Sequence, residues 1–407
     1  MHETAVSTRP ERLRLSALFF VHAQANGLWF MAMSNVLRAH GFERIVPYTI
    51  ACYAIAAMIS PLVLGSLADQ HLPANRLLRW LAVGTGIFLA FTMLAVERAW
   101  SAASVLALLQ IHALCSAPMW GLSTSIVLAR LREPEREFGP IRAWATIGWM
   151  SAGPLTSFVL VADSSTRAGF AASLIWLAVA AFTYTLPEVP PLGRGTAHSW
   201  RDVLGFRALA LLGHRDHRVV FVTAALFCVP LAAFYPFTPL HLGDLGVVGT
   251  TAAMSLGQIT ETITMFGLAA LFGRFRLKWI FLTGIGFGIA RYVIFALDTK
   301  TALLAGIALH GLCYTLFFIT AQLYLEKRID PQLRARAQSL LTLMSGGLGT
   351  LIGAIASGWW RDACRVGNAT NWPQFWLGMA GAIGVVFVFF AVSYRGLAAM
   401  NTDSPQM

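Results

Sequence analysis

Charged residues are scarce in this sequence. They make up 12% of its 407 residues, whereas hydrophobic residues make up 57%. A soluble globular domain usually carries about 25% charged residues, which it needs to cover its surface. The composition therefore excludes an ordinary soluble protein and indicates a chain that lies mostly in lipid.

Cysteine is also rare, with five residues in the whole chain. Cys364 is the one that falls in an expected outward loop, and the other four (Cys52, Cys115, Cys228 and Cys313) fall in apolar runs. This distribution gives no disulfide framework.

Several motifs of pumps and enzymes are absent. The pairs Gly84/Gly86 and Gly284/Gly286 lack the lysine and the strand context of a phosphate-binding loop. Zinc-ligand spacings and catalytic Cys/His spacings are missing as well. We therefore expect neither an ATP-driven pump nor an enzyme, with no metal and no cofactor other than protons as the coupling ion.

Apolar runs are abundant and recur along the whole length. Each is long enough to cross about 30 Å of hydrocarbon, and backbone groups in lipid must be satisfied within their own segment, so the runs are expected to be helices. The sequence thus predicts an all-α membrane protein with twelve transmembrane helices. The twelve ranges are 15–37, 46–67, 77–96, 102–130, 139–161, 168–186, 218–241, 250–273, 279–296, 301–325, 335–359 and 372–396.

Basic residues are in excess, and the formal net charge is +11. If the N-terminus is cytoplasmic, 22 Lys and Arg residues fall on the cytoplasmic side and seven on the opposite side, with Arg291 inside the ninth span. This asymmetry is the positive-inside pattern, and it predicts that both termini are cytoplasmic. We therefore expect membrane lipid, and not nucleic acid, as the partner of the basic residues.

The longest polar interruption divides the chain into two sets of six spans. It predicts an N-terminal lobe over 1–186, a cytoplasmic linker over 187–217 and a C-terminal lobe over 218–407. The sequence around Arg142 is similar to that around Arg336 at an offset of 194 residues. Duplicated six-helix lobes are typical of the major facilitator fold. We expect a monomer, because each chain would contain its own pathway.

The segment Gly65–Asp69 closes the second span. It resembles the G-x-L-a-D loop signature of major facilitator carriers, although His71–Asn75 departs from the basic residues that usually follow. The acid can pair with a cation at a cytoplasmic helix end, such as Arg130 or Arg132. Asp69 is therefore a candidate gating residue; the alternative is an ordinary cytoplasmic turn.

Glu261 is the one carboxylate that the sequence places well inside an apolar segment. Gln258 lies three residues earlier, so both side chains share one face of the eighth helix. An acid at membrane depth is costly and usually marks an ion or substrate path. Glu261 is therefore the candidate proton-coupling residue, and the alternative is a structural polar clamp between helices.

Two further groups are candidates for solute binding. Arg142, Thr146 and Trp149 form one stripe near the start of the fifth helix. A cation, a hydroxyl and an aromatic face suit a planar polar ligand. The alternative is that Arg142 extends to the interface while Trp149 packs.

His310 and Tyr314 form an i, i+4 pair in the tenth helix. His310 suits substrate binding or proton relay, and the alternative is a satisfied interior histidine. The sequence leaves the roles of Arg291 and His22 open.

Several segments resemble one family. Residues 138–149 contain P-I-R-x-W-x-T-I-G-W and resemble a signature of the bacterial nucleoside:proton symporter family. Residues 255–261 resemble its S-x-x-Q-x-x-E motif, and residues 326–358 resemble its connection between the tenth and eleventh helices. The resemblance implies nucleoside binding by a set of matching residues: Arg142, Thr146, Trp149, Gln258 and Glu261.

Other positions depart from the family pattern. The seventh-helix Gln and Asn of the family align with Pro230 and Ala233, its tenth-helix Tyr with His310 and a following Asp with Thr315. Lost amide partners would change the hydrogen bonds that decide specificity.

We therefore expect a secondary active transporter that imports nucleosides or related small polar solutes with protons by alternating access. Its place would be the inner membrane of a bacterial cell. The alternative is a major facilitator carrier for another solute, such as an aromatic acid, a sugar or a siderophore-like compound, or a drug exporter.

Overall fold

The computed structural model describes residues 9–70, 72–189 and 206–396. Side chains at 61–70, 134, 135, 206–208, 269, 332 and 335 lie outside this description. The predicted linker over 187–217 falls mostly outside the described residues.

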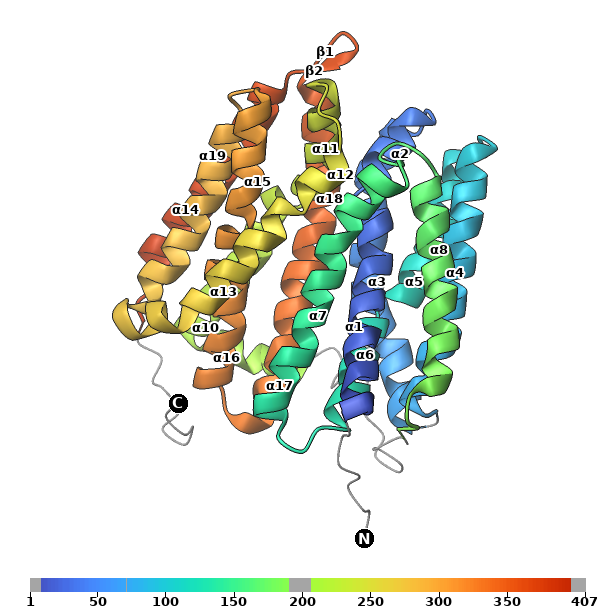
Figure 1. Cartoon of the computed structure of the whole chain (residues 1–407). Helices are drawn as coiled ribbons and strands as arrows, with labels where there is room; N and C mark the ends of the chain where they lie inside the picture. The colour runs from blue at the N-terminus through green and yellow to red at the C-terminus, as the bar shows by residue number, and fades with distance from the viewer. Residues whose placement is uncertain (1–8, 71, 190–205, 397–407) are drawn as a thin grey trace. The chain divides into compact units, whose positions relative to one another are not determined.

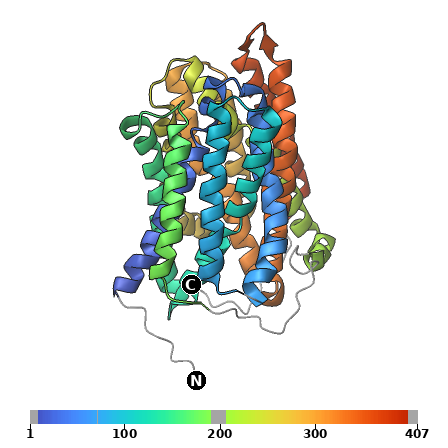
Figure 2. The same ribbon diagram turned by 90° about the vertical axis from the view of Figure 1, so that its right-hand side faces the viewer.

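Helices make up nearly all of the described structure (Figure 1). Helices α4 and α8 run side by side in both ribbon views (Figure 1 and Figure 2). The helices are α1 (Arg9–Phe30), α2 (Met33–Ala39), α3 (Val46–Gln70), α4 (Ala74–Glu97), α5 (Ala102–Ser116), α6 (Met119–Leu128), α7 (Pro134–Pro154), α8 (Arg167–Phe182), α10 (Arg215–Leu231), α11 (Phe234–Asp244), α12 (Thr250–Met254), α13 (Leu256–Arg274), α14 (Leu277–Phe295), α15 (Lys300–Tyr314), α16 (Thr320–Arg328), α17 (Pro331–Thr342), α18 (Thr350–Ala363) and α19 (Trp372–Ser393).

Short elements fill several of the connections. A two-residue hairpin pairs β1 (Arg365–Val366) with β2 (Ala369–Thr370) in antiparallel register. Three π-helical turns continue α7, α15 and α17: Leu155–Val159, Thr315–Ile319 and Leu343–Gly349. Three 3-10 turns complete the set: Glu43–Ile45, Thr183–Thr185 and Phe206–Gly213.

The apolar runs of the sequence form helices, as predicted. Helical structure covers most of each of the twelve predicted ranges within the described residues. Among those residues, eight helical stretches are long and apolar enough to cross a membrane. The count of twelve spans stays a prediction. The eight stretches are Ala74–Glu97, Ala102–Leu128, Arg167–Thr185, Arg215–Asp244, Leu277–Phe295, Lys300–Arg328, Arg336–Ala363 and Trp372–Ser393.

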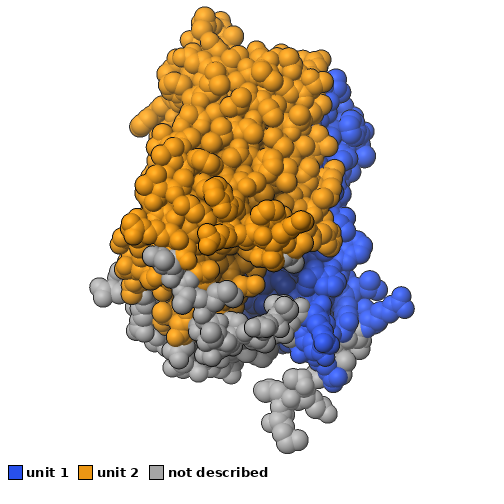
Figure 3. Space-filling view, turned by 90° about the vertical axis from the view of Figure 1, so that its left-hand side faces the viewer, with its two compact units in different colours: residues 1–197, 248–255 blue, residues 198–247, 256–407 orange. Residues whose placement is uncertain are grey.

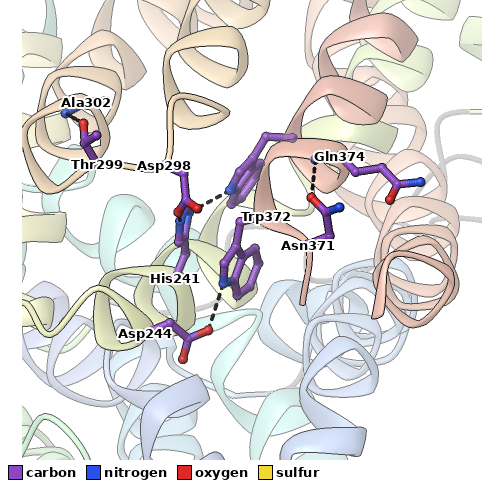
Figure 4. Close-up of polar contacts among 9 residues, drawn as sticks. His241, Asp244, Asp298, Thr299, Ala302, Asn371, Trp372 and Gln374 are labelled. Atoms are coloured by element: carbon purple, nitrogen blue, oxygen red, sulfur yellow. Dashed lines mark hydrogen bonds and ion pairs between the residues drawn. The ribbon is translucent and has the colours of Figure 1, made fainter. Parts of the chain in front are cut away.

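Several helix boundaries follow from local chemistry. Thr299 caps α15 by accepting a hydrogen bond from the backbone N–H of Ala302, and Asn371 caps α19 in the same way through Gln374 (Figure 4). The seventh predicted span is split into α10 and α11 at Ala232 and Ala233. Pro236, in the first turn of α11, has no N–H for the carbonyl of Ala232 and its ring crowds that carbonyl, so an interruption at this point is expected.

The chain divides into two compact units (Figure 3). Unit 1 comprises residues 1–197 and 248–255, and unit 2 comprises 198–247 and 256–407. The short helix α12 therefore groups with unit 1, although the chain before and after it belongs to unit 2. No feature of the sequence predicts this excursion, so the units differ from the predicted lobes here.

In unit 1, α1 packs closely on α7. A Cβ added at Gly148 would lie 2.1 Å from the backbone oxygen of Phe20, and one at Gly27 would lie 2.7 Å from the Cβ of Ala152. Only glycine allows such an approach of two helix backbones. This contact places the Arg142–Trp149 stripe beside α1.

In unit 2, α15 packs against both α13 and α14. A Cβ added at Gly311 would lie 1.9 Å from the backbone nitrogen of Glu261. On the other side, a Cβ at Gly306 would lie 3.1 Å from the backbone oxygen of Arg291. Two close helix contacts thus fix the carboxylate-bearing helix and the arginine-bearing helix against α15.

Candidate functional site

In unit 1, α7 carries all three residues of the predicted stripe. Arg142 is half-buried, and its guanidinium lies 4.2 Å from the ring centroid of Trp120 and 5.8 Å from that of Phe19. These distances fit cation–π contacts, which hold the guanidinium against aromatic surface inside the unit. Thr146, one turn further along α7, is half-buried as well.

Trp149 ends this stripe with an unused hydrogen-bond donor. Its ring lies 6.0 Å from that of Phe30, which in turn contacts Tyr53 edge-on. The indole Nε1 is buried and has no hydrogen-bond partner. A buried indole N–H usually finds an acceptor, so this atom is suited to a bound solute or water.

The two interior histidines of unit 1 are satisfied by the fold. His22 lies with its Nδ1 3.1 Å from the hydroxyl of Ser123, between the rings of Trp120 and Trp176. His112 contacts the backbone oxygen of Thr85 through Nδ1 and the Tyr53 hydroxyl through Nε2. Both rings therefore have structural partners.

In unit 2, Gln258 and Glu261 lie within the first turns of α13. Gln258 is buried, its Nε2 donates to the Tyr235 hydroxyl at 3.3 Å, and its Oε1 has no hydrogen-bond partner. Glu261 is half-buried. The phenol of Tyr235 interacts electrostatically with both Glu261 and Arg291. The amide and the acid therefore share a neighbourhood that also contains a cation.

His310 stands opposite them on α15. Its Nδ1 lies 2.7 Å from Nη1 of Arg291, and its ring stacks on Phe234 with centroids 4.4 Å apart and an interplanar angle of 7°. The ring of Tyr314 lies 6.0 Å away. The predicted i, i+4 pair thus lies beside a buried arginine, whose role the sequence left open.

The sequence did not predict two of the residues that pack around His310. Phe234 and Tyr235 follow the helix break after Pro230, and their sequence context resembles ordinary apolar packing. Arg291 was noticed without a partner, because His310 lies 19 residues away across the turn between α14 and α15.

The predicted gating residue Asp69 lies near the end of α3, and its side chain falls outside the described set. Of its two proposed partners, Arg130 forms an ion pair with Glu11 at 2.6 Å. The backbone N–H of Arg132 donates to Glu137. The gating role stays a prediction.

A second polar network in unit 2 centres on His241, which has no exposed surface (Figure 4). Its Nδ1 lies 2.9 Å from the indole nitrogen of Trp376, and its Nε2 lies 2.7 Å from Asp298. Its ring stacks on Trp372, whose indole N–H donates to Asp244 at 2.8 Å. An indole nitrogen only donates, so Nδ1 accepts and the proton of a neutral ring is on Nε2.

The helix α12 is held in unit 1 by a carboxylate and a hydroxyl. Asp163 accepts hydrogen bonds from the backbone N–H of Thr251 at 2.9 Å and from the Ser157 hydroxyl at 2.7 Å. Ser157 in turn accepts from the backbone N–H of Ala252 at 2.9 Å. The first backbone donors of a helix lack partners within it, and these two side chains supply them.

In the part of the chain that the structure describes, no group of three or more His, Cys, Asp and Glu side chains is placed to hold a metal ion.

Comparisons with known proteins show which proteins this chain is similar to. A family model described as nucleoside H+ symporter matches residues 10–398. YegT of Escherichia coli (strain K12) is 30% identical over 406 residues, covering 94% of this chain and 93% of that protein. The nucleoside permease NupG of the same organism is 25% identical over 405 residues, covering 94% of this chain and 95% of that protein.

The solved structures agree on the fold. A crystal structure of a mutant form of the nucleoside transporter NupG matches with a TM-score of 0.86 at 24% identity. The match covers 94% of this chain and 100% of that chain. The fold is therefore that of the major facilitator transporters, as predicted.

Proposed function

Because the chain belongs to the nucleoside H+ symporter family, we propose that different residues bind the proton and the solute in a multi-pass inner-membrane transporter. This transporter imports nucleosides or related small polar solutes with protons. In this proposal, Glu261 on α13 carries the coupled proton. Gln258, one turn away, binds the solute next to it. The observation that carries the proposal is the half-buried carboxylate beside a buried amide with an unused oxygen.

The remaining solute contacts come from two sets of side chains. In unit 1 they are Arg142, Thr146 and Trp149, where a cation and an aromatic face can hold a planar base. In unit 2, His310 and Tyr314 join Gln258. The unused indole N–H of Trp149 and the unused Oε1 of Gln258 support this assignment, since each is a buried polar atom without a partner.

The sequence supports four further parts of the proposal. Asp69 acts in gating, both termini are cytoplasmic, the chain works as a monomer in the lipid bilayer, and protons are the coupling ion with no other cofactor. The loop signature ending at Asp69 supports the first of these, and the distribution of Lys and Arg supports the second.

A coupled proton can supply useful work. Each charge that crosses the membrane contributes about 2.3 kcal/mol per 100 mV. Since about 1.4 kcal/mol corresponds to a tenfold ratio, one proton could support about fiftyfold accumulation of a neutral solute. Protonation of Glu261 neutralises it and removes the cost of a buried charge while the site changes its access.

Transport into proteoliposomes tests the coupling. In Glu261→Gln, nucleoside should no longer accumulate under an imposed pH gradient, whereas exchange of labelled for unlabelled nucleoside should persist. Glu326→Gln is the matched control, because that carboxylate is exposed and pairs with Arg334. Accumulation by Glu261→Gln at the wild-type level would overturn the assignment.

A carrier for a different solute is the second candidate. Pro230 and Ala233 stand where the family pattern has amides, and this observation favours it. A thermal-shift panel of nucleosides, nucleobases, aromatic acids and sugars distinguishes the two. A shift with a compound of another class and with no nucleoside would favour this candidate.

A further inference from the structure

Arg291 is a cation with no exposed surface in the apolar helix α14, one turn before the helix ends. A charge in this position is costly, and such residues usually serve a function. Its guanidinium lies 4.6 Å from the ring centroids of both Phe234 and Tyr292, and its Nη1 donates a hydrogen bond to Nδ1 of His310. Its Nε and Nη2 are buried without a partner.

The contact with His310 determines where the imidazole carries its proton. A guanidinium has donors and no acceptor, so the Nη1–H must donate and Nδ1 of His310 must accept. The proton of the neutral ring is then on Nε2. A doubly protonated ring would set one N–H against another and would place two cations 2.7 Å apart.

The packing also fixes the direction of this ring. It is stacked on Phe234, and a Cβ added at Gly257 would lie 3.1 Å from the Cδ2 of His310, 3.2 Å from its Cβ and 3.4 Å from its Cγ. The Cδ2 side of the imidazole therefore faces α13, while Nδ1 faces Arg291 on α14. Helix side chains lean toward the N-terminus, which brings the Gln258 and Glu261 side chains toward this level.

We propose that Arg291 is a positioning residue that holds His310 as a neutral Nε2–H donor, which selects solutes with an acceptor oxygen. The selection of solute rests on the proposed function; the protonation of His310 does not. A carbonyl or hydroxyl oxygen of the solute can accept a hydrogen bond from the Nε2–H of His310. A solute group with only N–H donors leaves that N–H unpaired, which costs the free energy of a buried unsatisfied donor.

Several other titratable groups face this pair, and the test must separate them. They are Glu261 on α13, Tyr235 on α11, Tyr292 on α14, and Cys313 and Tyr314 on α15. A variant that removes the guanidinium leaves all of them in place. The ratio of the variant's KM to the wild-type KM, measured at the same pH, therefore cancels their common contribution.

Counterflow of labelled nucleoside in proteoliposomes without a pH gradient is the first measurement. In Arg291→Met, neutral His310 is no longer restricted to one tautomer. At pH 8, where an imidazole is neutral, KM should therefore rise by up to about fivefold relative to wild type, the usual effect of one hydrogen bond.

Two variants control this measurement. Arg291→Lys keeps a donor-only cation and should restore the wild-type KM. In a His310→Gln background no imidazole remains to be positioned, so adding Arg291→Met should change KM little. An unchanged KM in Arg291→Met alone, or the same rise in both backgrounds, would overturn the proposal.

Nitrogen-15 NMR of the wild-type protein tests the protonation state without any variant of Arg291. With labelled histidine, the His310 signals are those absent from His310→Gln. One protonated and one unprotonated ring nitrogen should persist from about pH 8 to about pH 5.5, where an ordinary imidazole becomes cationic. Protonation of both nitrogens in this range would reject the inference. Absence of nucleoside counterflow by wild type would instead reject the proposed function.

Discussion

Each unit contains an arginine beside a histidine, and the two pairs differ in the partner that the histidine bonds. In unit 1, His22 interacts electrostatically with Arg142 but makes its hydrogen bond to the Ser123 hydroxyl. In unit 2, His310 bonds Arg291 directly. A hydroxyl can donate or accept, whereas a guanidinium can only donate. His22 can therefore take either tautomer, whereas His310 is restricted to the tautomer with its proton on Nε2.

The two arginines, Arg142 and Arg291, also differ in exposure. Arg142 is half-buried over Trp120, so its guanidinium can reach a solute. Arg291 has no exposed surface and can act on a solute only through His310. One cation is thus suited to direct contact and the other to positioning.

The largest expected effect comes from breaking the packing beside the Arg291–His310 pair of unit 2. In Gly311→Ala the new Cβ would lie 1.9 Å from the backbone of Glu261, and α13 and α15 would have to separate. Overpacking costs about 1–3 kcal/mol and sometimes more. We expect a marked loss of thermal stability in detergent. Gly121→Ala, whose Cβ would meet open space, is the control; equal stability of the two variants would refute the contact.

Next in size is the direct contact of unit 1. Arg142→Ala should raise KM for nucleoside about tenfold, equivalent to about 1.4 kcal/mol, while the fold is retained. Arg142→Lys should recover only part of this, because an ammonium lacks the planar fork and stacks less well on Trp120. Counterflow kinetics give both values, and an unchanged KM in Arg142→Ala would remove Arg142 from the site.

A smaller effect is expected at the His241 network. Trp376→Phe removes the indole N–H that donates to Nδ1 while keeping most of the aromatic packing. The lost hydrogen bond should cost about 1 kcal/mol of stability, with substrate affinity unchanged. A melting curve measures the first and a binding assay the second; a large change in affinity would show that this network belongs to the solute site.

The smallest effect should come from Ser123→Ala. The variant removes the hydroxyl partner of His22, which keeps its contacts with Trp120 and Trp176. We expect KM within about twofold of wild type and a loss of about 1 kcal/mol of stability or less. A tenfold rise in KM would show that the two arginine–histidine pairs act alike.

Much of the architecture could be predicted because it depends on contacts near in sequence. Apolar runs of membrane length became helices, and Arg142, Thr146 and Trp149 share α7 because their spacing matches one helix. The pair of Gln258 and Glu261 follows the same rule on α13.

Contacts between distant residues could not be predicted. Arg291 bonds His310 only because α14 and α15 pack as a hairpin, and His241 meets an acid 57 residues away. Tyr235 lies beside Gln258 because the chain turns after Pro230, and no local pattern distinguishes it from packing aromatics. The sequence therefore predicts which site residues share one helix, but not the contacts between helices, since periodicity describes one helix at a time.

The hydrogen bonds of α12 have a consequence for the helix that follows it. The chain leaves unit 2 after Val247, α12 is held in unit 1 by Asp163 and Ser157, and the chain returns to unit 2 at Leu256. Gly246 and Gly249, next to the first of these crossings, have positive φ angles of 67° and 77°, which glycine adopts without strain. Since α13 begins at Leu256, the same hydrogen bonds restrain the chain directly before the helix that carries Gln258 and Glu261.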